Sequence, residues 1–434
     1  MSELVPQIQL DTRERIAMAR MLCVLCMIFV HVPDGQSIAQ VYSLTTGGFA
    51  IFLEGFLVEG PGRASAALLS VVSGYLAATT LLKPGSSVWS LYRRRFVSII
   101  LPMIFWACVT YVVYLVVSQS RPTFLEDAKT VLDKLNIIFF ITEMPLGATM
   151  HLGFLRDLFV CVLLSPLLLL GIRRMAWFVL PMLGMLYVFE HNQSFVLILR
   201  PLVLFAFSIG IYLAVRGARL DALDRLWPVF VMLSIIATMI ILLANSGVGD
   251  TAVQAFAKRG LEFDETVLYP FGRLFGSLAI WTLLPWFLGG KLQIWVKRFT
   301  PYLFAAFCSH YLMLTLLFYG GWSPLFGGRQ SDSFIIWFLS APLVSMAVAV
   351  MVVTVAQWVA PPLATLITGG RLKTAKAGAS VDALGERRKQ GVAVGGWLIL
   401  ASAYEAVSGF ISSLVRGWFE ASRRLLLGRA GREE

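Results

Sequence analysis

Long apolar segments dominate this 434-residue chain and restrict what it can fold into. Because a helix rises 1.5 Å per residue, about twenty apolar residues cross the roughly 30 Å hydrocarbon core of a bilayer. Hydrophobic residues make up 58% of the sequence and charged residues only 14%, a balance that soluble domains of this length do not have. A membrane β-barrel would instead show segments of about ten residues with alternating polarity. We therefore predict an all-α integral membrane protein.

The hydropathy pattern predicts a bundle of about ten transmembrane helices. The expected spans are residues 16–33, 63–82, 96–118, 152–171, 176–190, 195–214, 226–244, 266–288, 301–320 and 335–359. Lys and Arg gather before the first span and in the even-numbered connections, and this asymmetry places both termini in the cytoplasm. It also accounts for the net charge of +11. We therefore expect a lipid bilayer around the chain and no nucleic acid partner.

Two further segments are apolar but carry charged residues. Residues 45–62 contain two glutamates, which suits a re-entrant or interfacial element on the outer side. Residues 393–419 lie between basic clusters and suit an amphipathic helix on the cytoplasmic leaflet, with an eleventh span as the alternative. We therefore expect a polytopic membrane domain over residues 1–370 and a basic cytoplasmic tail over residues 371–434.

Two polar residues share one face of the first span. Arg20 and His31 are eleven positions apart, about three helical turns, so their side chains point the same way and lie roughly 16 Å apart along the axis. A cation and an imidazole inside a membrane span are costly, and such residues usually face a protein interior or a wet cavity. We therefore expect this pair to be functional, with Arg20 near the inner end and His31 near the outer end.

Charged residues of other spans fall at a similar outer level. They are Arg156 with its neighbour Asp157, Arg200 and Arg273, roughly 6–10 Å deep, and His151 at the outer surface. An arginine near a helix end can also simply extend to the interface, and Arg156 with Asp157 can be a structural pair. Because several helices bring cations to one depth, we predict a cationic cavity that opens outward and takes an anionic or oxygen-rich ligand.

The composition of this cavity excludes several kinds of chemistry. The chain has no carboxylate pair of a glycosidase, no Cys/His cluster with metal-ligand spacing and no phosphate-binding loop. An imidazole that deprotonates a hydroxyl, with arginines that stabilise an oxyanion, would catalyse acyl transfer. An exporter of an anionic metabolite or a lipid-linked sugar remains the alternative. His310, in the middle of the ninth span, fits a packing histidine and a site residue equally well.

Several motifs resemble those of the membrane acyltransferase-3 family over about residues 13–360. They are Arg20-x10-His31, Ser73-Gly74-Tyr75, the run Arg93-Arg94-Arg95 leading to Pro102, HLGFLRDLF at 151–159 and LFAFSIGIYLA at 204–214. Two departures stand out. The family usually repeats an arginine after two intervening residues where this chain has three contiguous arginines, and Gly153 stands where the family usually has Trp.

The resemblance implies a bacterial inner-membrane enzyme with cytoplasmic acyl-CoA as donor and no metal. The acceptor would be a sugar hydroxyl of an extracytoplasmic polysaccharide or of its lipid-linked precursor. Within the family the chain looks most similar to the succinoglycan succinyltransferases of exopolysaccharide synthesis, which favours a succinyl group; acetyl transfer to a surface glycan is the alternative. Extra outer arginines would also suit the second carboxylate of a succinyl donor.

These considerations assign a role to each candidate site residue. His31 and Arg20 are expected in catalysis, Arg156, Arg200, Arg273, His151, Ser73 and Tyr75 in binding the substrate and acyl group, and Arg93, Arg94 and Arg95 in binding CoA. Ser73 is a conceivable nucleophile, although a structural role in a packed helix fits it better.

Overall fold

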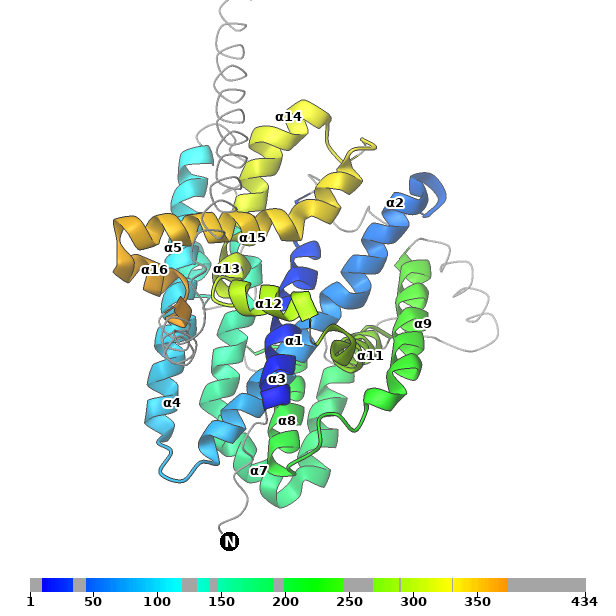
Figure 1. Cartoon of the computed structure of the whole chain (residues 1–434), viewed down its shortest axis with the longest axis vertical. Helices are drawn as coiled ribbons and strands as arrows, with labels where there is room; N and C mark the ends of the chain where they lie inside the picture. Colours follow the sequence, from blue (N-terminus) through cyan, green and yellow to red (C-terminus); the bar gives the residue numbers. More distant parts are fainter. Residues whose placement is uncertain are drawn as a thin grey trace, which may run out of the picture.

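The computed structural model describes residues 10–33, 44–118, 131–140, 147–189, 199–245, 268–288, 290–329 and 331–372. Within these ranges every regular element is a helix, and the helices form a bundle (Figure 1). Six of the described helical stretches are long and apolar enough to cross a membrane: Phe49–Leu81, Val88–Val116, Thr149–Phe189, Asp224–Leu243, Leu303–Phe326 and Phe334–Val359. The total of about ten spans and the cytoplasmic termini therefore stay predictions.

Each expected span coincides with helical structure where it is described. The helices are α1 (Leu10–Phe29), α3 (Arg63–Leu81), α5 (Leu101–Ser118), α7 (Gly153–Phe189), α8 (Pro201–Val215), α9 (Trp227–Asn245), α11 (Leu268–Leu283), α13 (Leu303–Leu317) and α15 (Phe334–Val359). The long helix α7 holds the fourth and fifth expected spans, and it breaks at Met175, whose φ of −140° and ψ of 43° are not helical. The break lies between the two spans that hydropathy separates.

The segment 45–62 differs from its expected form. Helix α2 (Leu44–Leu57) continues through a π-helical turn, η2 (Val58–Gly62), directly into α3. Its two glutamates are paired, Glu54 with Arg329 and Glu59 with Arg63, both at 2.8 Å. The segment therefore extends the second span instead of forming a separate re-entrant or interfacial element.

Helices α3 and α8 cross in close contact at the centre of the bundle. A Cβ atom on Gly74 of α3 would overlap the carbonyl oxygen of Phe207, and one on Gly210 of α8 would overlap the carbonyl oxygen of Val71. Any larger side chain at either glycine would push the two backbones apart. Gly74 of the Ser73-Gly74-Tyr75 motif and Gly210 of the motif at 204–214 therefore allow the same close helix crossing.

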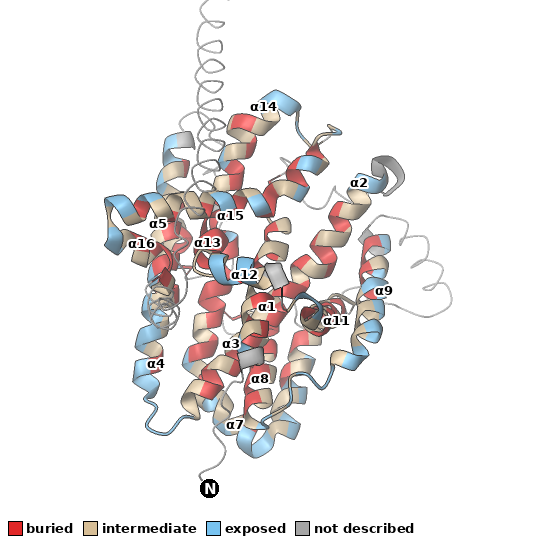
Figure 2. Cartoon of the chain, in the orientation of Figure 1, coloured by how far each residue is buried: buried red, intermediate tan, exposed pale blue. Residues whose placement is uncertain are grey.

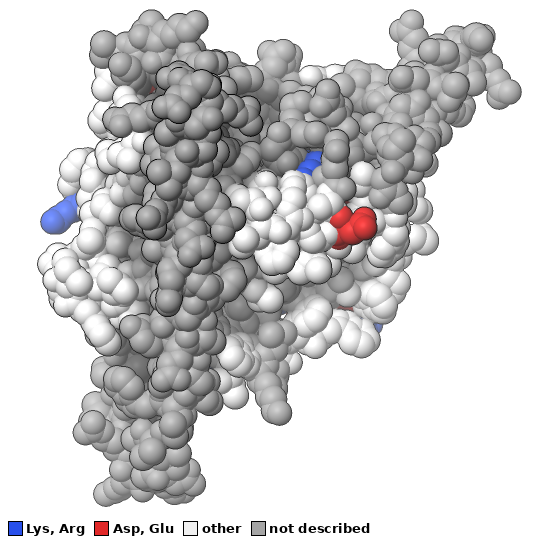
Figure 3. Space-filling model, turned by 90° about the horizontal axis from the view of Figure 1, so that it is seen from above, with Lys and Arg blue, Asp and Glu red and all other residues white. Residues whose placement is uncertain are grey.

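The interior and the exterior of the bundle differ clearly in exposure. Buried residues concentrate on α1, α3, α8 and α13, whereas the outer faces of α7 and α9 are exposed (Figure 2). Many exposed side chains are large and apolar, among them Trp177, Trp358 and Val359. Among the described side chains on the face shown in Figure 3, few are acidic or basic. The exposed apolar side chains suit contact with lipid.

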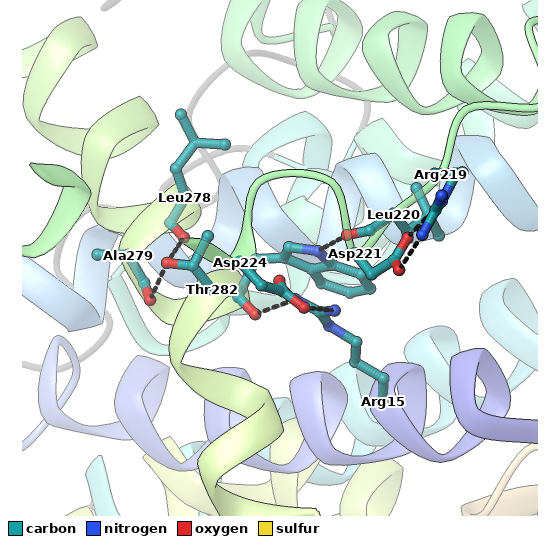
Figure 4. A network of polar contacts seen from close by, with 9 residues as sticks. Arg15, Arg219, Leu220, Asp221, Asp224, Leu278, Ala279 and Thr282 are labelled. Carbon is teal, nitrogen blue, oxygen red and sulfur yellow. Dashed lines mark hydrogen bonds and ion pairs between the residues drawn. The ribbon is translucent and has the colours of Figure 1, made fainter. Parts of the chain in front are cut away.

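A polar network fastens the first turns of α1 to two other elements (Figure 4). Arg15 is only 3% exposed and donates to Asp224, which begins the short helix η6 (Asp224–Leu226), with one bond of 2.8 Å. Arg15 also donates to the carbonyl oxygen of Trp281 on α11 at 2.7 Å and lies 4.3 Å from the centre of its ring. This arginine, which counted toward the basic side of the membrane, is therefore a buried structural residue.

The last described residues belong to the bundle. Helix α16 (Pro361–Ile367) follows α15, and Arg371 after it packs against the ring of Phe304 at 3.8 Å. Arg371 therefore packs with the bundle, and the expected domain boundary between residues 370 and 371 stays a prediction. The rest of the expected tail, with the helix at 393–419, lies outside the described residues.

Candidate functional site

Three histidines from distant parts of the chain meet at one end of α1. His31 follows α1, His151 lies in the 3₁₀ helix η5 (Gly147–Leu152), and His310 lies on α13. The ring centre of His31 lies 6.0 Å from that of His151 and 5.5 Å from that of His310. The ring centres of His151 and His310 are 4.6 Å apart. We call these residues the histidine cluster. The sequence predicted that His31 and His151 lie near the outer side of the membrane, and it did not decide whether His310 is a site residue or a packing residue.

Helix α13 holds two of the three rings in place. The Nε2 atom of His151 lies 3.0 Å from the carbonyl oxygen of Cys308, and the Nδ1 atom of His310 lies 2.6 Å from that of Phe307. His151 is 4% exposed and His310 is fully buried. His31 is half-buried and lies at the edge of this pair. The described residues contain no group of metal-binding side chains arranged to hold a metal ion.

Two arginines lie close enough to His31 for their charges to act on it, Arg63 and Arg200. Arg200 precedes α8, and its side chain is 42% exposed and 3.5 Å from Asp157. Arg63 is the first residue of α3 and was not singled out from the sequence. Its position at the start of an expected span, in register with the other outer cations, was the available signal.

The remaining outer arginines are engaged with other groups. Arg156 donates to Asp157 at 2.6 Å and to the carbonyl oxygen of Phe140 at 3.3 Å, and both charged residues are buried. This geometry is the structural pair that the sequence allowed. Arg273 interacts with Tyr187, with the charges of Arg63 and Glu59 nearby. The charge of Arg63 therefore acts on both Arg273 and His31.

A second group of cations lies toward the other end of α1. Arg20, Arg95 and Arg371 are half-buried, and each lies within electrostatic range of the other two. We call them the arginine cluster. No described carboxylate forms an ion pair with Arg20 or Arg95. Neighbouring positive charges of this kind suit an anionic ligand.

The basic run at the end of α4 (Val88–Arg95) is divided by this arrangement. Arg93 and Arg94 are exposed, and Arg94 donates to the carbonyl oxygen of Ser90 at 3.2 Å. Only Arg95 turns toward Arg20. The structure therefore separates the three arginines that the sequence treats as one group.

Arg371 is the member of the arginine cluster that the sequence did not indicate. It donates to the carbonyl oxygens of Ser98 and Thr368. Gly369 precedes it with φ of +59°, and a Cβ atom there would overlap the carbonyl oxygen of Ser98. The chain reaches this position only after α15 and α16 have crossed the bundle, so hydropathy could not place it.

Ser73 and Tyr75 flank the glycine of the helix crossing. Ser73 is half-buried, and Tyr75 is 8% exposed within the main apolar core. In the described part of the chain, neither hydrogen-bonds to a histidine of the cluster. Their position accords with the structural role of this motif.

Comparison with known proteins identifies the family of the chain. The chain matches the Acyltransferase domain family, Acyl_transf_3, over residues 13–360. It is 27% identical over 374 residues to the "Succinoglycan biosynthesis protein ExoH" of Rhizobium meliloti (strain 1021), covering 82% of this chain and 92% of the relative. No solved structure matches it. Because the family match covers most of its length, this multi-pass membrane protein belongs to the acyltransferase-3 family.

Proposed function

We propose that the chain transfers a succinyl group from cytoplasmic succinyl-CoA through the inner membrane to a sugar hydroxyl. The acceptor is an extracytoplasmic polysaccharide or its lipid-linked precursor. One observation carries the proposal: α1 connects the arginine cluster to the histidine cluster, with Arg20 on the helix and His31 two residues beyond its last residue, Phe29. Family membership and the relative in succinoglycan biosynthesis support it.

The arginine cluster provides the donor end. Arg20, Arg95 and Arg371 would bind the phosphates of CoA, because guanidinium groups form charge-assisted hydrogen bonds with phosphate oxygens. Arg93 and Arg94 lie exposed beside this position and would attract the donor electrostatically. From there an extended pantetheine arm would carry the thioester along α1 over roughly 16 Å.

The histidine cluster provides the reacting end. His31 would accept the proton of the sugar hydroxyl while the oxygen attacks the thioester carbonyl carbon. The resulting tetrahedral oxyanion would be stabilised by the charges of Arg63 and Arg200. The carbon–sulfur bond then breaks, and the CoA thiolate leaves and takes the proton from His31. The new ester bond holds the acyl group on the sugar.

The proposal is tested by release of free CoA from purified protein in lipid nanodiscs. Succinyl-CoA and acetyl-CoA are compared, with alkali-treated succinoglycan as acceptor. We expect release that His31→Ala lowers at least about a hundredfold, the typical effect of losing a general base. His31→Gln, which keeps the size of the side chain, controls for folding. Release that survives both substitutions, or no release from either donor, would contradict the proposal and favour an exporter.

The identity of the acyl group depends on Arg200, the most exposed arginine near His31. If its guanidinium binds the distal carboxylate of a succinyl donor, Arg200→Gln should raise the KM for succinyl-CoA about tenfold, as expected for loss of a charged hydrogen bond. The KM for acetyl-CoA should change less than about threefold by the same reasoning. Equal changes for the two donors would argue for acetyl transfer.

A further inference from the structure

Within the described part of the chain, two nitrogen atoms of the histidine cluster are buried and have no hydrogen-bond partner. They are Nδ1 of His151 and Nε2 of His310. On each ring the other nitrogen is bonded to a carbonyl oxygen of α13, from the consecutive residues Phe307 and Cys308. Each of the two rings is therefore anchored through one nitrogen and unsatisfied at the other.

The anchoring bonds determine which nitrogen carries hydrogen. A carbonyl oxygen only accepts, so Nε2 of His151 and Nδ1 of His310 must be the protonated atoms. In a neutral imidazole the second nitrogen then has a free lone pair and can only accept. The cluster thus presents two acceptors, on rings whose centres are 4.6 Å apart, and no described group donates to them.

Such an arrangement is unfavourable unless a ligand completes it. A buried acceptor without a partner destabilises the fold, and most buried polar groups are satisfied. Both acceptors lie on rings centred within 6.0 Å of His31. A ligand that satisfies them must bring hydroxyl or similar donor groups to this place.

We propose that His151 and His310 form a hydroxyl-recognition pair for the acceptor sugar. A hydroxyl carries a single hydrogen, so Nδ1 of His151 and Nε2 of His310 each take one from a different hydroxyl. A neighbouring third hydroxyl on the same sugar then meets His31. The two histidines are positioning residues, and the site selects a polyol over water or a simple alcohol. This inference rests on the proposed function and assigns His310 a part in it.

Matched substitutions test the position of each acceptor atom. The amide of Asn lies where Nδ1 of histidine lies, and that of Gln lies near Nε2. His151→Asn should therefore keep an acceptor in place and His151→Gln should not. At His310 the order should reverse, with Gln the better replacement. The measured quantity is the KM for methyl β-D-glucopyranoside as acceptor, relative to the KM for the acyl-CoA donor.

We expect the poorer replacement at each position to raise the acceptor KM about tenfold over the better one, consistent with one lost buried hydrogen bond. Donor KM should stay within about twofold by the same argument. If the histidines had a purely structural role, the same replacement, Asn or Gln, would be the better one at both positions, or the acceptor KM and the donor KM would change together. Either result would overturn the inference.

A second measurement does not depend on catalysis. The chain contains only four histidines, so protein labelled with ¹⁵N-histidine gives an NMR spectrum that single variants can assign. We expect His151 to carry hydrogen on Nε2 and His310 on Nδ1, and their unprotonated nitrogens to shift when methyl β-D-glucopyranoside is added but not with cyclohexanol. The opposite tautomers, or no shift, would overturn the pair. Shifts in a protein that releases no CoA would instead contradict only the acyltransferase proposal.

Discussion

At the scale of single residues, the position of each arginine separates structural from functional candidates. Arg156 is buried and tied to Asp157, and Arg15 is buried and tied to Asp224. Arg20 and Arg95 have no such carboxylate among the described residues, and Arg371 lies beside them. A buried arginine paired with an acid satisfies the fold, whereas Arg20 and Arg95, which form no ion pair with a described carboxylate, suit an anion from elsewhere.

Arg371 provides a test of the donor site that is independent of the histidines. Arg371→Gln should raise the KM for acyl-CoA about tenfold, because a charge-assisted bond to phosphate is lost, while the acceptor KM should hold. Arg371→Lys should recover part of the affinity. Arg94→Gln, at an exposed position, serves as the control and should have an effect of less than about threefold. If Arg371→Gln and Arg94→Gln changed the KM for acyl-CoA equally, Arg371 would not be part of the donor site.

At the scale of helices, the site depends on how closely a few elements approach. The crossing of α3 and α8 at Gly74 and Gly210 joins the helices that begin next to Arg63 and Arg200, the two cations near His31. Helix α13 fixes His151 and His310 through its carbonyl oxygens. The cluster is therefore set by helix packing more than by direct bonds among its own side chains.

The glycine crossing leads to a prediction about stability. Gly74→Ala should lower the free energy of unfolding by about 1–3 kcal/mol or more, because the added Cβ overlaps the carbonyl oxygen of Phe207. Gly171→Ala is the control, since its Cβ would meet only the side chain of Val179 at 3.5 Å, an ordinary contact. Thermal unfolding in detergent measures both. If the two variants unfold at the same temperature, the crossing is looser than described here.

At the scale of the whole molecule, the proposed reaction requires the two clusters to face opposite sides of the membrane. The α3–α4 connection lies at the same end of the bundle as Arg95. The start of α15 lies at the other end, where α13 finishes. Positive-inside asymmetry predicts that the first of these lies in the cytoplasm. The proposed direction of acyl transfer depends on this predicted orientation.

Labelling with a membrane-impermeant thiol reagent tests the orientation. Cysteine placed at Lys83 should react only in inverted vesicles, and cysteine placed at Asp332 should react in intact cells, because both residues are exposed at opposite ends of the bundle. The five native cysteines are half-buried or buried and serve as the background. Reaction of both sites from the same side would contradict the proposed path of the acyl group.

The sequence alone determined the class of this protein, because hydropathy and the spacing of Arg20 and His31 are local properties of a helix. Only the tertiary structure decided which charges meet. Arg63, His310 and Arg371 are far apart in the chain, and their neighbours depend on how α3, α13 and α16 pack. Periodicity gives the face of one helix, but contacts between helices follow from side-chain and backbone fit, as at Gly74 and Gly210.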